Sequence, residues 1–310
     1  MVSRRSFLSL PTALLTVLLA ACQKELVYED YGEVKEVKLS YTEPSTLQYH
    51  QDIDSIRWLL FDGEGRFYQE LHMDHCQRQY FDRSDLPDGD YTVVCLANAT
   101  DRSFLDNSAL TLDSLTLWAD TRRDDGSYDN IDCLFWTMQR FHMGDGIHVV
   151  ECPMVDIHCH LHVRLWWRGV PTRTDGAYTL RLFDVPLSCK AGTMAYNIGG
   201  LPHPDLGETL GEHRIAVEPY NFIISGEFVT MRWTDDYMPS LQLWCGDEPA
   251  TPLIDLYQVF SEWHWSPDHT IAQDYWLNIE VGLDGSVEVS VGGKGRIVDW
   301  QDGGVIGGNV

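Results

Sequence analysis

The stretch DIHCHLHVRLWW, residues 156–167, is the most regular part of this sequence and decides its fold. Apolar residues occupy every second position of it. This period of two is typical of a β-strand, whose successive side chains point to opposite faces. One face carries Ile157, Cys159, Leu161, Val163 and Leu165, and the other carries Asp156, His158, His160, His162, Arg164 and Trp166. The stretch therefore predicts a long strand with one face in a core and one polar face.

Short runs of the same kind fill most of the remaining chain. The run SIRWLLFD, residues 55–62, is followed by a glycine-containing loop and a second run, which predicts a β-hairpin. Near the end of the sequence, Asp284 and Gly285 separate two alternating runs and predict another hairpin. One helix is expected near residues 252–260. Many short strands and little helix predict an all-β fold of two β-sandwich domains in series.

The first 21 residues have the pattern of an export signal. Arg4 and Arg5 precede a hydrophobic run of fifteen residues, Phe7–Ala21, which is shorter than the roughly 20 apolar residues of a membrane span. The run leads into LAAC, residues 19–22, which resembles the lipobox of bacterial lipoproteins. This resemblance implies cleavage before Cys22 and attachment of lipid to its sulfur and its amine. Several acyl chains hold a protein on a membrane far more firmly than one chain does.

Other interpretations of the leader stay open. The sequence SRRSFL, residues 3–8, nearly matches the twin-arginine export motif, whose substrates are exported already folded. An uncleaved anchor or an ordinary signal peptide would also fit the hydrophobic run. We expect a lipoprotein signal peptide over residues 1–21 and a polar tether over residues 22–32.

The length of the mature chain fits two domains. Removing 21 of the 310 residues leaves 289, and ordinary domains have about 100 to 200 residues. Pro153 interrupts a strand-like run just before the long alternating stretch, so the boundary is expected there. The predicted domains are an N-terminal β-sandwich over residues 33–152 and a C-terminal β-sandwich over residues 153–310.

The mature chain is strongly acidic. The leader holds two of the 22 basic residues and none of the 47 acidic ones, so its removal changes the formal net charge from −25 to −27. Such a surface repels phosphate backbones and anionic lipid headgroups. Nucleic acid is therefore not an expected partner, and contact with the outer membrane is expected through the lipid.

Seven cysteines remain beside Cys22, an odd number for an exported chain. They are Cys76, Cys95, Cys133, Cys152, Cys159, Cys189 and Cys245. Their spacing contains no C-x-x-C pair and matches no zinc finger. One or more disulfides would be compatible with export, but the spacing does not specify a pairing.

The three histidines of the long strand are candidate metal ligands. His158, His160 and His162 lie two residues apart on one face, with successive Cβ atoms about 6.5 to 7 Å apart. Two of them could share a zinc ion with Asp156 or a distant histidine. A cupin would use a similar H-x-H pair, but it needs a glutamate three to five residues later, and none stands there. We favour an exposed strand face without metal or cofactor.

No catalytic motif stands out in the sequence. A G-x-S-x-G elbow, a phosphate-binding loop, G-x-G-x-x-G and H-E-x-x-H are all missing. The second half is rich in tryptophan, which could form a sugar-binding platform or part of a core. These tryptophans are Trp233, Trp244, Trp263, Trp265 and Trp276. We expect a protein that is not an enzyme.

Five segments of the chain together carry a family resemblance. They are LAAC at 19–22, SIRWLLFDGEGRF at 55–67, LPDGDYTVVCLAN at 86–98, the strand at 156–167 and GRIVDWQDG at 295–303. With them the chain resembles the FimB-type fimbrial subunits of Bacteroidales, a family of lipoprotein anchors of the major and minor fimbriae. The resemblance covers nearly the whole mature chain, and the histidines of the long strand depart from it.

The resemblance implies two transthyretin-like β-sandwiches, lipid attachment to the outer membrane and a place in a fimbrium that serves cell adhesion. It also implies joining to other fimbrial subunits by exchange of a β-strand. Stalk subunits of this kind are trimmed by an arginine-specific protease near the first strand, whereas this chain has no arginine between Cys22 and Ile56. The chain is therefore expected to be the anchor.

Two segments are expected to pair with a neighbouring subunit. Glu33–Tyr41 alternates imperfectly and carries lysines, which is typical of an edge strand. Ile297–Trp300 is the second such segment. The alternative function is a surface glycan-binding lipoprotein that uses the tryptophans of the second half.

Overall fold

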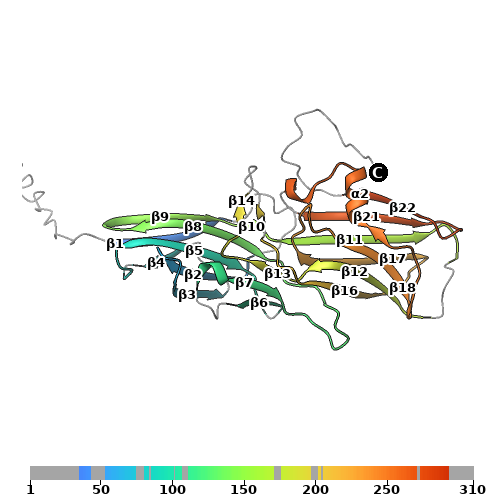
Figure 1. Ribbon diagram of the computed structural model, residues 1–310, viewed down its shortest axis with the longest axis horizontal. Helices are drawn as coiled ribbons and strands as arrows, with labels where there is room; N and C mark the ends of the chain where they lie inside the picture. The colour runs from blue at the N-terminus through green and yellow to red at the C-terminus, as the bar shows by residue number, and fades with distance from the viewer. Residues whose placement is uncertain are drawn as a thin grey trace, which may run out of the picture.

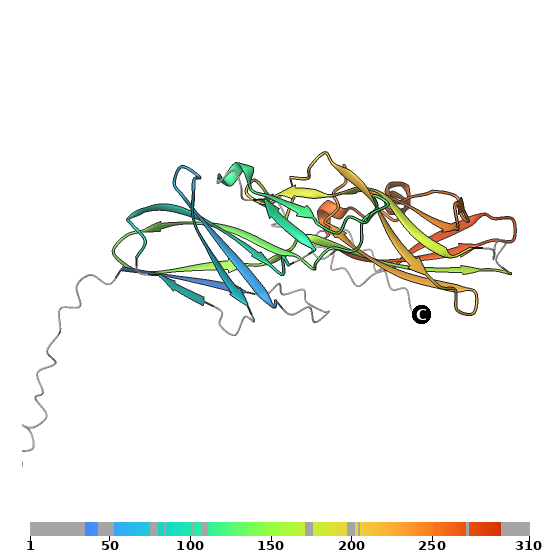
Figure 2. The ribbon, with the colours of Figure 1, turned by 90° about the horizontal axis from the view of Figure 1, so that it is seen from below.

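The fold of this chain is all-β, as predicted. The computed structural model describes residues 35–42, 53–74, 80–83, 85–100, 102–106, 111–170, 176–196, 202–203, 205–270 and 273–292. They form two sandwich-like lobes that follow one another along the long axis (Figure 1, Figure 2). Among these residues there is no helix with the length and apolar character of a membrane span.

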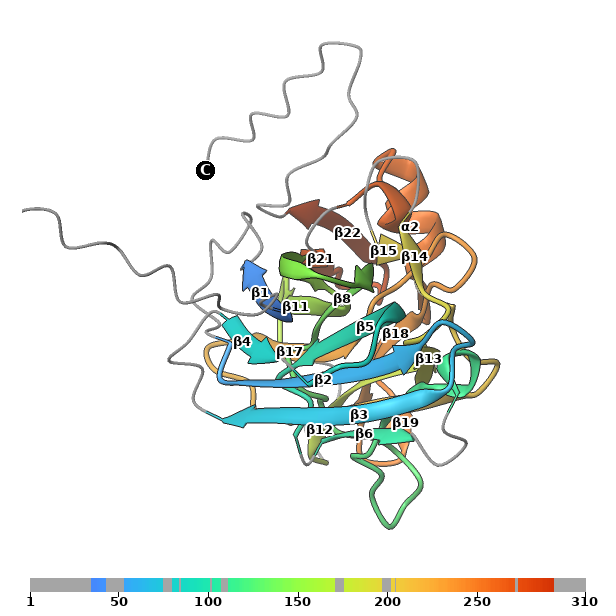
Figure 3. The same cartoon turned by 90° about the vertical axis from the view of Figure 1, so that its left-hand side faces the viewer.

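The first lobe is a sandwich of a three-stranded sheet and a five-stranded sheet. The orders are β4-β1-β9 and β10-β8-β5-β2-β3. Both sheets supply side chains to one core, such as Leu39 and Val150 from the first and Trp58 and Val93 from the second. Figure 3 looks onto this end of the molecule. The strands are β1 (Lys35–Thr42), β2 (Ser55–Asp62), β3 (Phe67–Asp74), β4 (Tyr80–Arg83), β5 (Gly89–Ala97), β8 (Phe135–Met143), β9 (Gly146–Pro153) and β10 (Val155–Asp156).

The second lobe has the same two-sheet plan. Its sheets have the orders β17-β11-β21-β22 and β16-β12-β18-β19, and β20 pairs with β18. Leu161 and Leu277 from the first sheet meet Leu180 and Leu243 from the second in one core. The strands are β11 (His158–Trp167), β12 (Tyr178–Pro186), β16 (Leu210–Val217), β17 (Ile223–Met231), β18 (Ser240–Cys245), β19 (Glu248–Pro249), β20 (Ile254–Asp255), β21 (Gln273–Val281) and β22 (Val287–Gly292).

The helical elements are short. The helix α2 (Leu256–Glu262) begins where the carboxylate of Asp255 accepts hydrogen bonds from the amides of Tyr257 and Gln258. Its buried Phe260 packs edge-on against Tyr275, with the ring centroids 4.7 Å apart. The helix expected near residues 252–260 is thus present but begins later. The other two helical turns are η1 (Leu112–Ser114) and η2 (Pro267–His269).

A third group of elements joins the lobes. The strand β13 lies beyond the long strand β11 in the sequence, yet it pairs with β7 of the first half in the sheet β13-β7-β6. A separate core at this seam includes Trp136 of the first lobe and Met231 of the second, and the indole of Trp136 donates to the carbonyl of Ala191 at 2.9 Å. The remaining strands are β6 (Ser103–Asp106), β7 (Thr116–Ala119), β13 (Ser188–Lys190), β14 (Ala195–Tyr196) and β15 (Pro202–His203).

Both predicted hairpins are confirmed. The turn between β2 and β3 contains Gly65 at φ +75°, and the turn between β21 and β22 contains Gly285 at φ +81°. Residues with a side chain rarely adopt this left-handed backbone conformation, which explains why glycine occupies both positions. The division of the chain at residues 152 and 153 stays a prediction. Near it, β9 ends at Pro153, and β10 still pairs with β8.

Candidate functional site

The strand β1 is the first candidate for an interaction with another chain. It pairs antiparallel with β4 from Val37 to Ser40 and parallel with β9 from Lys35 to Thr42. The side chains of Val37 and Leu39 are completely buried in the first-lobe core. The prediction that Glu33–Tyr41 is an edge strand is therefore wrong for the part that the structure describes. Alternating apolar residues fit a central strand as well as an edge strand, and only the long-range return of β9 decides between them.

The structure does not describe the other predicted interaction residues. Cys22, the predicted lipidation residue, is outside the described residues, and so is the segment Ile297–Trp300. In the described sheets, the strands β3 and β22 occupy outer positions. An outer strand presents unpaired backbone amides and carbonyls on one side, so each is a further surface on which a strand could pair.

The three histidines of β11 do not form an exposed face, and that interpretation is wrong. His158 is 7% exposed, and the side chains of His160 and His162 are 13% and 19% exposed. Phe135 packs edge-on against His158, and the Trp276 ring stacks on His162 with the centroids 4.1 Å apart. The neighbouring strands place large side chains over this face, which the alternation within β11 could not reveal.

A group of metal-ligating side chains, here called the histidine cluster, gathers at this face. It comprises Cys133, His158, His160, His162 and Glu227. The sulfur of Cys133 lies 3.3 Å from Nε2 of His160, whose Nδ1 lies 3.1 Å from a carboxylate oxygen of Glu227. Cys133 precedes β8, and Glu227 stands opposite His162 in the pairing of β17 with β11. No sequence pattern had linked Cys133 or Glu227 to the histidines.

Burial sets the charge state of the cluster. It lowers the pKa values of His158 and His160 to about 4, so both imidazoles are neutral at neutral pH. Asp156, weighed above as a third zinc ligand, is not a member of the cluster. Its side chain is buried, which raises its pKa to about 6 against the opposing charge of Arg232. The cluster thus offers neutral nitrogen donors beside a thiol.

The five tryptophans of the second lobe do not form an exposed row. Trp233 is completely buried, and the indole nitrogen of Trp265 is buried as well. The guanidinium of Arg181 covers Trp244 at 3.7 Å from the ring centroid. Trp263 and Trp276 are 39% exposed, and one face of Trp276 is taken by His162. Trp233 and Trp265 therefore serve the core, and the other three lie nearer the surface.

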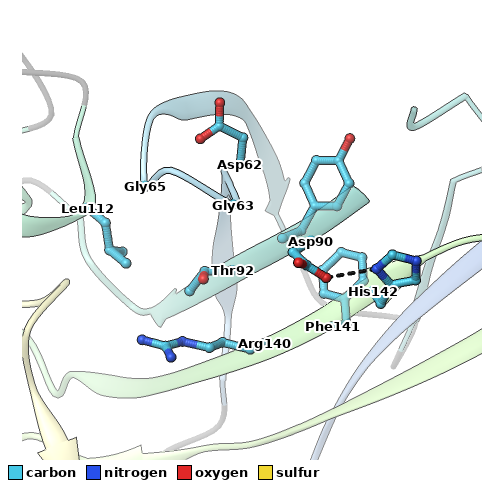
Figure 4. A pocket seen from close by; sticks show the side chains of 10 residues that line it. Asp62, Gly63, Gly65, Asp90, Thr92, Leu112, Arg140, Phe141 and His142 are labelled. Atoms are coloured by element: carbon cyan, nitrogen blue, oxygen red, sulfur yellow. Dashed lines mark hydrogen bonds and ion pairs between the residues drawn. The ribbon is translucent and has the colours of Figure 1, made fainter. Parts of the chain in front are cut away.

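A shallow depression of about 550 Å³ lies on the first lobe beside the β2–β3 turn (Figure 4). At one side of it, Nδ1 of His142 lies 2.7 Å from a carboxylate oxygen of Asp90, and both side chains are exposed. Asp62 is instead bound to Arg66 at 2.8 Å. Both ion pairs are accessible to solvent.

The structure describes six cysteines. Four of them carry free thiols in the described part of the chain, Cys95, Cys152, Cys159 and Cys189. The other two described cysteines are Cys133 and Cys245. Cys95 and Cys152 hydrogen-bond in the first-lobe core, where burial raises the pKa of the Cys95 thiol well above its usual value. The Cys133 thiol is half-buried and the other five are buried. Cys133 is therefore the described thiol with the best access to solvent.

The fold and these surfaces define an elongated structural protein of two β-sandwich lobes. Residues 34–199, more than half of the chain, match the model of the fimbrillin-A associated anchor proteins Mfa1 and Mfa2. The chain therefore belongs to this family of fimbrial anchor proteins.

Solved structures share the fold. The fimbrial anchor protein Mfa2 from Porphyromonas gingivalis is 12% identical, with a TM-score of 0.60 over 85% of this chain and 99% of that one. A "putative adhesin" from Bacteroides thetaiotaomicron is 12% identical, with a TM-score of 0.65 over 87% of this chain and 100% of that one. At this identity the likeness establishes the fold alone. A comparison with curated proteins found no match.

Proposed function

We propose that this chain is a lipoprotein of the outer membrane that anchors a fimbria and joins other fimbrial subunits by exchange of a β-strand. Membership of the anchor family supports a structural role at the cell surface and no enzymatic one. The observation that carries the proposal is β1, a strand close to the lipidation residue that fills a place between β4 and β9.

The lipid and β1 belong to one continuous N-terminal segment. Twelve residues lie between Cys22 and Lys35, where β1 begins, so the lipid lies at most about 45 Å along the chain from the first lobe. No arginine interrupts this segment. A chain that is not cleaved there keeps both its lipid and its own first strand, which is what an anchor requires.

The pairing of β1 shows how an incoming strand would be held in a neighbouring subunit. A strand placed between two others satisfies backbone groups on both sides, and its alternate apolar side chains enter the core. In β1 these side chains are Val37 and Leu39. Val298 and Trp300 alternate in the same way. We therefore assign Ile297–Trp300 as the segment that enters a neighbouring subunit.

The lipid is tested by labelling cells with a palmitate analogue that can be coupled to a dye. The wild-type chain is expected to carry the label and to remain with the outer membrane. The Cys22→Ser variant is expected to lose both, and Cys245→Ala, in a cysteine of the second-lobe core, is expected to keep both. A labelled or membrane-bound Cys22→Ser variant would contradict the lipid anchor.

Strand exchange is tested in a chain that keeps its lipid. Val298→Asp and Trp300→Asp place a charge on the face that would enter the neighbouring core, so both should abolish co-purification of other fimbrial subunits. The matched control is Asp299→Ala, which alters the opposite face of the same segment. Equal recovery of subunits with all three variants would eliminate this segment as the exchanged strand.

Glycan binding receives less support than anchoring. A sugar platform needs a row of exposed rings, but Trp233 is buried in the core, Trp265 packs against this core and Arg181 covers Trp244. Trp263 and Trp276 are exposed, and His162 takes one face of Trp276. Retention on a polysaccharide affinity gel that is lost in Trp263→Ala would favour the glycan-binding alternative.

A further inference from the structure

The histidine cluster lies where the two lobes meet. The backbone carbonyl of Cys133 accepts a hydrogen bond from the side chain of Asn98, which directly follows β5 in the first lobe. His158 and His160 stand at the start of β11, the long strand of the second lobe. A ligand shared by Cys133, His158 and His160 would therefore connect the lobes.

We propose that Cys133, His158 and His160 bind a zinc ion. Their three donor atoms all lie within 4.8 Å of one another. With Zn–N bonds of about 2.0–2.1 Å and a Zn–S bond of about 2.3 Å, donor atoms of a tetrahedral site lie about 3.3–3.6 Å apart. The separation of 3.3 Å between the Cys133 sulfur and Nε2 of His160 already fits this geometry. The more distant donor atoms must approach one another by about 1 Å, which side-chain rotation can provide.

The surroundings prepare both imidazoles as ligands. Nδ1 of His158 donates to the backbone carbonyl of Leu134 at 2.8 Å, which leaves the lone pair on Nε2 for a metal. Nδ1 of His160 lies 3.1 Å from Glu227, so a carboxylate orients this ring as in many zinc sites.

The charges nearby are mixed but favour a cation at this place. Both carboxylate oxygens of Asp274 are buried without a hydrogen bond, although one of them lies 2.9 Å from Nε2 of His162. Its negative charge acts on both His158 and His160, whereas the buried Arg232 acts on His158 in the opposite sense. A bound cation would provide the compensation for Asp274 that the present contacts do not.

A second set of ligands, His160, His162 and Glu227, overlaps with the first. His160 uses Nε2 toward Cys133 and Nδ1 toward Glu227, so one zinc ion cannot take both sets. We assign the set that contains the thiol because sulfur and imidazole donors favour zinc. Glu227 then orients His160, and the fourth coordination position of the ion is left to water. The ion would fasten the segment before β8 to β11.

The test uses the mature, lipidated, untagged chain in detergent, after removal of metal with a chelator. Titration with zinc chloride should show one ion per chain. Cobalt(II) in its place should give the charge-transfer absorption of a cobalt–thiolate bond. Cys133→Ser should abolish this absorption and weaken zinc binding at least about 100-fold, because it removes a direct ligand. His160→Gln should weaken binding to a similar degree.

Two further variants separate binding from folding. Glu227→Gln keeps all three ligands and should weaken binding about tenfold by loosening His160. His142→Gln alters an exposed histidine of the first lobe and should bind as the wild type does. Circular dichroism in chelator checks that each variant is folded, and zinc should slow alkylation of Cys133 in the wild type. Failure of the wild type to bind zinc, or wild-type affinity in a folded Cys133→Ser variant, would overturn the site.

Discussion

The strands β1 and β11 occupy equivalent positions but are held very differently. Each lies between one antiparallel and one parallel neighbour, β4 and β9 for β1, and β17 and β21 for β11. Yet β11 forms nine residue pairs on each side, whereas β1 forms four with β4 and eight with β9. Among the described residues, the same arrangement therefore has a longer pairing around β11 than around β1.

The surroundings add to this difference. At its start, β11 lies against the seam, where the hydrogen-bonded segment 128–131 and the strand β13 tie the lobes together. The strand β1 lies in the first lobe, among the elements at the end that faces the viewer in Figure 3. A strand that can be replaced needs few contacts beyond its two neighbours, and β1 meets this condition better than β11 does.

The largest effect is expected from removing a core side chain of β11. Leu161 is completely buried between the two sheets, so Leu161→Ala should lower the free energy of unfolding by about 3–5 kcal/mol. Arg164 is exposed at the far part of the histidine-bearing face of the same strand, and Arg164→Ala should change the free energy of unfolding by less than about 0.5 kcal/mol. Chemical denaturation of the mature chain measures both. A small loss in Leu161→Ala would show that β11 is no better anchored than β1.

A smaller effect is expected in β1, and a peptide should reverse it. Leu39→Ala should cost about 2–3 kcal/mol, because the short pairing with β4 lets the strand settle inward. A synthetic peptide of residues 35–42 should bind this variant by taking the place of the weakened strand. Fluorescence anisotropy measures the binding, with a peptide carrying aspartate in place of Val37 and Leu39 as the control. A corresponding β11 peptide should not bind Leu161→Ala, and binding there would remove the distinction.

The sequence predicted the positions of single strands well, but it predicted poorly which strands lie beside one another in a sheet. The alternation at 156–167 located β11, and glycines located two hairpins, because both signals are local. The parallel return of β9 beside β1 is a long-range event, and no local pattern distinguishes a central strand from an edge strand. The three histidines were recognised as candidate metal ligands, but Cys133 and Glu227 were missed for the same reason, since they reach β11 from separate segments of the chain.

The seam should weaken in acid through His213 of β16. This imidazole is buried against Tyr128, near Asp129 and Arg123, and burial lowers its pKa to about 4 from a usual 6.5. The unfolded chain takes up a proton near pH 6.5 and the folded chain does not, so stability falls as the pH falls through this window. Between pH 7.5 and pH 5 the part of the loss that is due to His213 should be about 2 kcal/mol, in addition to any contribution from His158 and His160. Chemical denaturation at both pH values, in the presence of a chelator, measures this change in the free energy of unfolding.

The control for this pH effect is His213→Gln, which removes the titrating group and keeps a polar side chain. Between pH 7.5 and pH 5, this variant should lose about 2 kcal/mol less of its free energy of unfolding than the wild type does. The stability of β1, measured by binding of the 35–42 peptide to Leu39→Ala, should not respond to His213. Identical pH slopes in the wild type and His213→Gln would show that protons act elsewhere.

The smallest effect is expected from Asn130, which fixes the connecting segment to β17. Its side-chain amide donates to the carbonyl of Glu227 at 2.9 Å, and its side-chain oxygen accepts from the amide of Val229 at 3.0 Å. Asn130→Ala should cost about 1 kcal/mol, because water can replace part of each bond at this half-buried position. Asn130→Asp keeps the acceptor and should recover part of the loss. Denaturation measures stability, and hydrogen exchange at the Val229 amide should accelerate in Asn130→Ala while exchange in β1 stays unchanged. Acceleration in both strands would mean that the seam supports β1 as well, and β1 could then not be exchanged independently of the second lobe.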